Sequence, residues 1–535
     1  MSGSESSPQP ADEVELIFVL SSSDASAFSA VRAFASAKNL SITREILDPP
    51  SVWLKGSAHE VDTVFQVHLT IRITPNGRQP DAGKALPIPD SLSGIVQAVL
   101  GANHTPLIQA PVFSRRPVTP TGPIRTAPIL AEQYSFPAGT TGAGQKVGIV
   151  LLGGGVPISD QSPFADYFES LCLTVPMLSV VAVDGAKNDP ASADAIYDLL
   201  KDFGSCGPPL LSCDGDAARA ADVWPTRQRT RSPTAASRDS DSELNQINWT
   251  CEGIMDVELL GGVAPGCEIV VYVCPNTTKG IFTAFLQAAT DGVDIVSCSW
   301  SSPESTLEPT YLYAINAALG YLSRQKITVC GSTGNSGSTP LAPTISTVEV
   351  SYPASDPNVL ACGGNMQVTT GADGSEETDK TWRESGGGAV YATGGGFSKL
   401  FSAPAWQSLS GVGYQGSSPG RGVPDVSSET SFESGMWIWY KDLNTASGGT
   451  SASAPVWAGL VARLNQALGQ RLGTVGEYLY EPSVAATFAD VTTGNNVVIK
   501  GIEYYKAGAG WDPCTGLGRP DGTALLAALR DLLKT

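Results

Sequence analysis

The sequence predicts an α/β protein with a doubly wound parallel sheet, preceded by a smaller α+β unit. From residue 146 onward, short and almost continuously apolar runs alternate with segments of helical apolar spacing. This pattern is typical of right-handed β-α-β crossovers around a buried sheet. Residues 14–103 follow a different order, β-α-β-β-α-β. The 535 residues are enough for both units, since a domain usually holds about 100–200 residues.

The amino-terminal unit is expected to be ferredoxin-like, because a split β-α-β pattern runs through it. We expect strands at 14–20, 41–47, 51–57 and 67–74, and helices at 23–40, 58–66 and 91–101. The three histidines of the chain, His59, His68 and His104, belong to this unit. We expect all three to be satisfied or solvated side chains, so any catalysis in the rest of the chain proceeds without imidazole.

Residues 105–140 are rich in proline and typical of a linker. Beyond them we expect strands at 146–153, 267–273, 293–300 and 327–332, and helices at 280–290 and 311–325. The chain therefore divides into residues 1–104, the linker 105–140 and one large domain at 141–535. The polar residues 225–247 predict a surface insertion in that domain.

Composition excludes several functions. The net charge of −19 makes the chain a poor partner for nucleic acid or an anionic membrane, and no apolar run is long enough for a membrane span. None of the ten cysteines shows CxxC spacing, which argues against a zinc site. Cys206 and Cys213 are the most plausible disulfide pair. The amino-terminal residues lack the pattern of a signal peptide.

Ser451 is the candidate nucleophile. It follows two glycines and Thr450, and an apolar-periodic helix continues to residue 468. A serine at a glycine turn and a helix N-terminus has backbone N–H groups nearby that favour a developing negative charge. Many serines in this setting are simply N-caps, so the motif alone leaves both interpretations open.

Glu252 and Asp256 are the candidate base. They are four residues apart on an expected helix and share one face of it. Two neighbouring carboxyl groups shift each other's pKa values apart, so one can be protonated while the other is ionised. Such a pair can accept and return a proton as imidazole does, most naturally below neutral pH. The alternative is a solvated acidic helix face.

Five motifs together resemble the sedolisin, or serine-carboxyl peptidase, family and in particular its kumamolisin branch. They are the GGTSASAP motif of Ser451, the ExxxD motif of Glu252 and Asp256 followed by APG, TGGGFSKLFSAPAWQ (393–407), GRGVPDVS (420–427) and GWDPCTGLG (510–518). Residues 14–120 look like the prodomain of that family, and the stretch from about 190 to 247 resembles an insertion. The likeness covers the remaining chain.

The resemblance implies a subtilisin-like fold and a serine endopeptidase made as a zymogen. Peptide or protein substrates are expected, and the prodomain would act as an intramolecular inhibitor and chaperone until self-cleavage in the linker. We expect a monomer. The resemblance favours an extracellular location, whereas the missing signal pattern leaves a cytoplasmic one open.

Position by position, Ser451 resembles the nucleophile of the family, Glu252 its general base and Asp256 the carboxyl group that orients and protonates that base. The family has an oxyanion-stabilising aspartate in a Gly-Asp-Ser-Gly turn, and the matching turn here, GSTGNSG, holds Asn335. An amide donates a hydrogen bond at every pH, whereas a carboxyl group donates only when protonated. We expect Asn335 to weaken the acid dependence. The rival interpretation is a catalytically impaired or repurposed protein, either a calcium-stabilised binding or scaffold protein or a specialised peptide-processing enzyme.

Two further features follow from the resemblance. The branch often has an additional glutamate after GGG in the first loop of the domain, where this chain offers Ser159 and Asp160. The second feature is one structural Ca²⁺ ion near the carboxyl terminus, because oxygen ligands from carboxylates and a glycine-rich loop suit this ion. Its expected ligands are Asp490, Val491, Gly508, Gly510 and Asp512.

Overall fold

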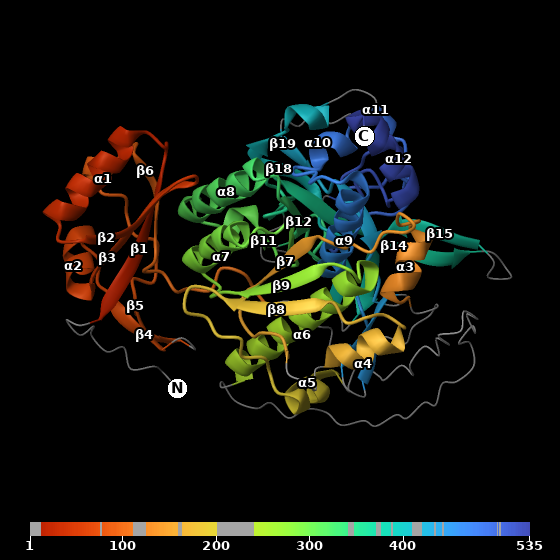
Figure 1. Cartoon of the computed structure of the whole chain (residues 1–535), viewed down its shortest axis with the longest axis horizontal. Coiled ribbons are helices and arrows are strands. Elements are labelled where there is room, and N and C mark those ends of the chain that lie inside the picture. Colours follow the sequence, from red (N-terminus) through yellow and green to blue (C-terminus); the bar gives the residue numbers. More distant parts are fainter. Residues whose placement is uncertain are drawn as a thin grey trace.

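The protein is described by a computed structural model that covers residues 12–74, 77–110, 125–158, 163–200, 240–340, 347–370, 376–386, 389–408, 420–432, 435–440, 443–499, 501 and 504–534. Ser159, Asp160, the predicted pair Cys206–Cys213, and large parts of the linker and the insertion lie outside these residues. Two units follow one another along the chain and pack together (Figure 1).

The larger unit is built on an eight-stranded sheet with the order β15-β14-β12-β10-β7-β9-β8, to which β20 is added beside β14. Neighbouring strands are parallel, except for the antiparallel pair β14–β15. The strands are β7 (Lys146–Leu151), β8 (Met177–Ala182), β9 (Glu268–Val273), β10 (Ile295–Cys298), β12 (Thr328–Ser332), β14 (Val359–Thr370), β15 (Glu376–Thr381) and β20 (Val426–Glu429). The predicted α/β class is confirmed.

Helices cover both faces of this sheet. The helices α7 (Thr278–Thr290) and α8 (Pro309–Arg324) pack against each other on the face turned toward the amino-terminal unit (Figure 1). The helices α6 (Ser240–Val263) and α9 (Thr450–Leu468) pack against each other on the opposite face. The remaining helices are α3 (Ala127–Gln133), α4 (Pro163–Ser170), α5 (Ala193–Leu200), α10 (Gly476–Leu479), α11 (Pro482–Ala485) and α12 (Gly522–Leu533).

Four two-stranded pairs extend the larger unit outside its main sheet. They are β11 (Ser302–Pro303) with β13 (Ser351–Tyr352), β16 (Arg383–Gly386) with β17 (Ala389–Ala392), β18 (Gly396–Ser402) with β19 (Gly420–Val423), and β21 (Met436–Tyr440) with β22 (Leu443–Ser447). The helix α3 lies inside the stretch assigned to the linker, and Tyr134 and Phe136 after it are buried in the core of the larger unit. Among the described residues, no helix is both long and apolar enough to cross a membrane.

The amino-terminal unit has a four-stranded sheet with the order β2-β3-β1-β6, in which all neighbours are antiparallel. Its elements are β1 (Glu13–Leu20), α1 (Ala25–Ala37), β2 (Ser41–Leu47), β3 (Pro50–Ser57), α2 (Ala58–Phe65), β4 (Thr70–Thr74), β5 (Gly77–Asp81) and β6 (Val96–Leu100). The helix α2 begins with a capping box between Ser57 and Glu60. The first six elements predicted for this unit, from β1 to β4, are present.

Two predictions for this unit were wrong. The segment 91–101, expected to be a helix, forms a short 3₁₀ turn at Asp90–Leu92 and then the strand β6, which is the fourth strand of the sheet. The segment 67–74, expected in that place, supplies β4, which pairs only with β5. The reason is that β6 is buried on both faces except at Gln97. A short and mostly apolar run such as IVQAVL has the same appearance in a buried strand and in a buried helix.

The amino-terminal sheet lies between its own helices and the larger unit. Leu16 and Phe18 of β1 belong to the core under α1 and α2. Ile17 and Val19 alternate with them and belong to the core of the larger unit. The strands β1, β3 and β6 are largely buried, whereas the edge strand β2 is exposed. The two units are therefore joined by apolar packing over the central part of one sheet face.

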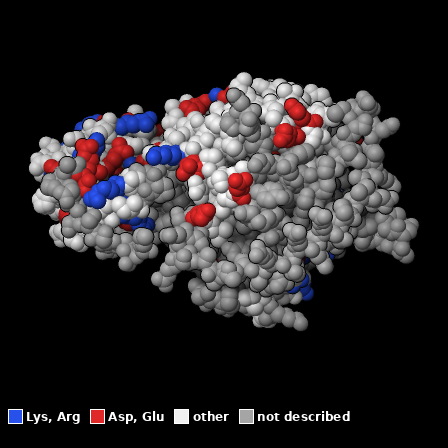
Figure 2. Space-filling model, turned by 90° about the horizontal axis from the view of Figure 1, so that it is seen from below, with Lys and Arg blue, Asp and Glu red and all other residues white. Residues whose placement is uncertain are grey.

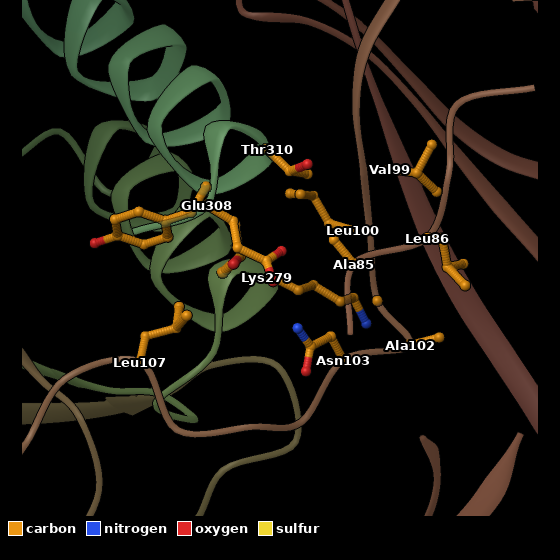
Figure 3. A pocket seen from close by; sticks show the side chains of 13 residues that line it. Ala85, Leu86, Val99, Leu100, Ala102, Asn103, Leu107, Lys279, Glu308 and Thr310 are labelled. Carbon is orange, nitrogen blue, oxygen red and sulfur yellow. The ribbon is translucent and has the colours of Figure 1, made fainter. Parts of the chain in front are cut away.

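Ion pairs across the boundary add to this packing. The ammonium group of Lys279 lies 2.8 Å from Glu15 of the amino-terminal unit and 2.8 Å from Asp184 of the larger unit. A second ion pair across the boundary joins Arg324 of α8 to Asp48 of the amino-terminal unit. Figure 3 shows Lys279 in a hollow of the boundary, facing the segment that contains Asn103. On the exposed surface of the amino-terminal unit, basic and acidic side chains are interspersed (Figure 2).

Candidate active site

Ser451 lies in the first turn of α9, at the turn that the sequence predicted. Gly449 leads into the helix with a φ of +83°, and a Cβ atom there would lie 2.7 Å from Nδ2 of Asn335, so only glycine fits at this position. Ser451 is 7% exposed. Its hydroxyl donates a hydrogen bond to the carbonyl oxygen of Ser299 at 3.0 Å. The hydroxyl of Ser451 is therefore held against the end of the strand β10.

Glu252 and Asp256 lie one turn apart on α6, as predicted, and both are buried. Their exposed fractions are 2% and 1%, so the alternative of a solvated acidic face is wrong. The helix α6 packs against α9, and this brings the hydroxyl of Ser451 close enough to Glu252 to lower the pKa of that carboxyl group. Within the described residues, Oε1 of Glu252 has no hydrogen-bond partner. This oxygen is available to accept a proton.

Burial determines the proton affinity of this pair. It raises the pKa of Glu252 well above its usual range, the charge of Asp256 raises it further, and the hydroxyl of Ser451 lowers it. Burial also raises the pKa of Asp256 to about 8, against a hydrogen bond from Ser299 that lowers it. Since two buried charges so close together repel each other, the pair retains a proton into the neutral range. Its ionised member can act as a general base.

Ser299 is a further residue of the site, and the sequence analysis missed it. It is 2% exposed and directly follows the strand β10. Its hydroxyl donates to Oδ1 of Asp256 at 2.7 Å and lies 3.1 Å from the carbonyl oxygen of Ser451. The sequence feature that could have identified Ser299 is its position at the carboxyl end of a parallel strand, where α/β proteins usually form their binding sites.

Asn335 follows the strand β12 and faces the start of α9. Its carbonyl oxygen Oδ1 accepts hydrogen bonds from the backbone N–H of Thr450 at 2.8 Å and from the hydroxyl of Thr450 at 2.9 Å. The hydroxyl oxygen of Thr450 in turn accepts the N–H of Gly334 at 3.0 Å. With its oxygen bound in this way, Asn335 presents its amide nitrogen toward Gly449, at the turn that leads into Ser451.

The five expected calcium ligands come from two segments that the structure brings together. Oδ2 of Asp490 accepts the N–H of Gly510 at 2.7 Å, and Oδ2 of Asp512 accepts the N–H of Gly508 at 3.2 Å. Val491 directly follows Asp490 in the sequence. Within the described ranges, no group of three or more His, Cys, Asp or Glu side chains could hold a metal. A cation here would therefore use the two carboxylates and backbone carbonyl oxygens.

Comparisons with known proteins agree with this geometry. A family model described as the subtilase family matches residues 235–485. Kumamolisin from Bacillus sp. (strain MN-32) is 33% identical over 519 residues, which cover 94% of this chain and 83% of the relative. Sedolisin from Pseudomonas sp. (strain 101) is 33% identical over 307 residues, which cover 54% of this chain and 50% of the relative.

Among solved structures, Pseudomonas sedolisin, described as a serine-carboxyl proteinase complexed with two molecules of pseudo-iodotyrostatin, superposes with a TM-score of 0.58 at 25% identity. The match covers 77% of this chain and 99% of the sedolisin chain. The likeness therefore extends over the whole of that solved chain.

We expect the free energy of unfolding to fall as the pH rises from about 4 to about 8. Burial raises the pKa of Asp256 to about 8 and that of Glu429, beside Arg125, to about 7. The unfolded chain releases these protons near pH 4. The stabilisation that these two groups provide is therefore fully present below their pKa in the unfolded chain. It is lost as the pH rises toward their pKa in the folded protein.

Urea unfolding at several pH values, in a Ser451→Ala background that excludes self-cleavage, measures this decline. Asp256→Asn removes one of the two titrating carboxyl groups, so the free energy of unfolding should fall less steeply with pH. Asp166→Asn changes an exposed carboxylate of α4 and serves as the control. A decline that is equally steep in both variants would contradict the assignment.

Proposed function

The chain belongs to the sedolisin family of serine-carboxyl peptidases, and from this premise we propose that it is an endopeptidase made as a self-processing zymogen. The family consists of serine-type hydrolases, and the chain is one of them. The observation that carries the proposal is the buried pair of Glu252 and Asp256 beside Ser451, because this pair supplies a base in a domain without histidine.

In the proposed reaction, Ser451 attacks the carbonyl carbon of a peptide bond and its hydroxyl proton passes to Glu252. Asp256 tunes the proton affinity of Glu252 through its charge. The proton then moves from Glu252 to the leaving amine. The amine departs, and the acyl group remains bound to Ser451. Water, activated by the same base, releases the acyl group.

The oxyanion of the tetrahedral intermediate would be held by the backbone N–H of Ser451 and by the amide nitrogen of Asn335. The hydrogen bonds from Thr450 to Oδ1 of Asn335 support this role, because they leave the NH₂ group free to point toward the reacting atoms. Loss of one such donor costs about 10²–10³ in rate. The alternative of an impaired or repurposed protein rests on the aspartate-to-asparagine replacement, and an asparagine held in this way weakens it.

The amino-terminal unit would act as the prodomain. Its sheet packs on the larger unit, and Glu15 pairs with the largely buried Lys279. An interface of this kind suits an intramolecular inhibitor that leaves only after the linker is cut. The cleavage site in the linker, the extracellular location and the monomeric state remain predictions.

Self-cleavage is the direct test of this function. Incubation of the purified chain between pH 3 and pH 8 should release a fragment of the size of the amino-terminal unit. Ser451→Ala should prevent it, while Ser453→Ala, on the same turn of α9, serves as the control for folding. A fragment that appears equally in wild type and Ser451→Ala, or in neither, would refute the proposal.

Asn335→Asp should narrow the pH range of peptide hydrolysis. The amide of Asn335 donates at every pH, whereas a carboxyl group donates only below its pKa. We therefore expect the variant to lose activity toward neutral pH by about 10²–10³ relative to its acidic maximum. Profiles of kcat/KM against pH decide the matter, and identical profiles for the two proteins would show that Asn335 is not the oxyanion donor.

We also propose one structural Ca²⁺ ion at the loop of Asp490 and Asp512. Asp512 is 5% exposed, and a buried carboxylate gains from a cation because burial otherwise disfavours its charge. Each ionised carboxylate has about four acceptor positions. Asp490 uses one of them for the N–H of Gly510. Asp512 accepts the N–H groups of Gly508, Cys514 and Thr515 and the hydroxyl of Thr515, so a bound ion would replace some of these hydrogen bonds. The hard oxygen donors of this set suit Ca²⁺.

Removal of calcium by a chelator should lower the thermal midpoint. At a calcium concentration of 100 times its dissociation constant, binding stabilises the folded state by about 2.7 kcal/mol. Asp512→Asn should have the lower midpoint already and should not respond to the chelator. A wild-type midpoint that is the same with and without calcium would exclude the ion.

A further inference from the structure

Ser299 contacts both helices that carry the catalytic groups. Its hydroxyl lies 2.7 Å from Oδ1 of Asp256 on α6 and 3.1 Å from the carbonyl oxygen of Ser451 on α9. Its own carbonyl oxygen accepts the hydroxyl of Ser451 at 3.0 Å. A serine hydroxyl has only one proton to donate. The two acceptors, Asp256 and the carbonyl of Ser451, are therefore alternatives.

Pro455 is the reason why the carbonyl of Ser451 is available. In an α-helix this carbonyl would accept the N–H of the residue four positions later. That residue is Pro455, which lies inside α9 and has no N–H. The proline thus leaves an acceptor open in the buried interior, and the hydroxyl of Ser299 is placed to fill it.

We propose that Ser299 is a positioning residue whose hydroxyl alternates between Asp256 and the carbonyl oxygen of Ser451, and thereby determines which carboxyl group of the catalytic pair holds the proton. This inference rests on the proposed peptidase function. It assigns a role to a side chain that neither attacks nor accepts a proton itself.

The two positions of the hydroxyl correspond to two distributions of one proton. When Ser299 donates to Asp256, the negative charge is favoured there and the proton resides on Glu252, which then cannot act as a base. When the hydroxyl turns to the carbonyl of Ser451, Asp256 loses its donor and takes the proton from Glu252. Glu252 is then ionised and can accept the proton of Ser451. No proton is gained or lost in the exchange.

The surroundings of the pair contain few other titrating groups. Burial raises the pKa of the thiols of Cys251 and Cys298, which therefore stay neutral. Glu258, the next acid on α6, interacts with Tyr167. The only charged side chain of α9 is Arg463, and its guanidinium is bonded to backbone and hydroxyl oxygens at the far part of that helix. The hydroxyl of Ser299 is thus the polar group best placed to shift the proton.

Two variants should move the pH profile of kcat/KM in opposite directions. Ser299→Ala removes the donor to Asp256, so the pair binds its protons more tightly and the profile moves to higher pH. Pro455→Ala supplies the missing N–H to the carbonyl of Ser451, keeps the hydroxyl on Asp256 and moves the profile to lower pH.

Matched controls separate this role from a structural one. Ser297→Ala removes a fully buried hydroxyl on β10, the strand that Ser299 follows. This hydroxyl has no partner among the described residues, so the variant should leave the profile in place. Ser299→Thr keeps a hydroxyl and should restore the position of the profile. Equal profiles for Ser299→Ala and Ser297→Ala, or shifts of Ser299→Ala and Pro455→Ala in the same direction, would overturn the proposal.

A second measurement does not depend on activity. In a Ser451→Ala background, Ser299→Ala should lose more stability than Ser297→Ala between about pH 4 and pH 8, because the folded pKa of Asp256 rises further without its donor. Equal pH dependence in the two variants would overturn the role of Ser299 even if the enzyme proved inactive. An inactive wild type would refute only the proposed peptidase function.

Discussion

The structure depends on the burial of two carboxyl groups next to each other. Glu252 and Asp256 expose almost no surface on α6, and the larger unit contains no histidine that could act in their place. A carboxylate in water is too weak a base for a serine hydroxyl, and burial raises its proton affinity toward the useful range. Burial of two charges is tolerable only while the pair keeps a proton. The chemistry and the stability of this unit therefore depend on the same titration.

The parallel sheet explains how residues from distant segments meet at this pair. The strands β10 and β12 are neighbours and parallel, so their carboxyl ends lie at one edge, where Ser299 and Asn335 follow them. The helix α9 packs across both strands. Its first two residues are each bonded to a different strand end, Thr450 to Asn335 and Ser451 to Ser299. Ser451, the proposed nucleophile, is thus positioned by the ends of two sheet strands.

The sequence was sufficient where a pattern is local and insufficient where packing decides. The glycine turn before Ser451 and the one-turn spacing of Glu252 and Asp256 are local, so both were predicted correctly. Ser299 was missed because its role depends on residues 43 and 152 positions away. The strand β6 was taken for a helix because its apolar run is buried on both faces, partly by the larger unit, and no property of the run itself records that second partner.

As the proposed oxyanion donor, the amide of Asn335 changes the pH dependence that we expect of this site. With a carboxyl group there, both the oxyanion donor and the base pair would have to be in the right protonation state, and the donor would require acid. An amide donor does not titrate, so the competent pH range is set by the pair alone. The pair is competent while it holds one proton, and the raised pKa of Asp256, about 8, extends that range toward neutral pH. The net charge of −19 therefore argues for solubility and self-repulsion, and it is not by itself an argument for work in acid.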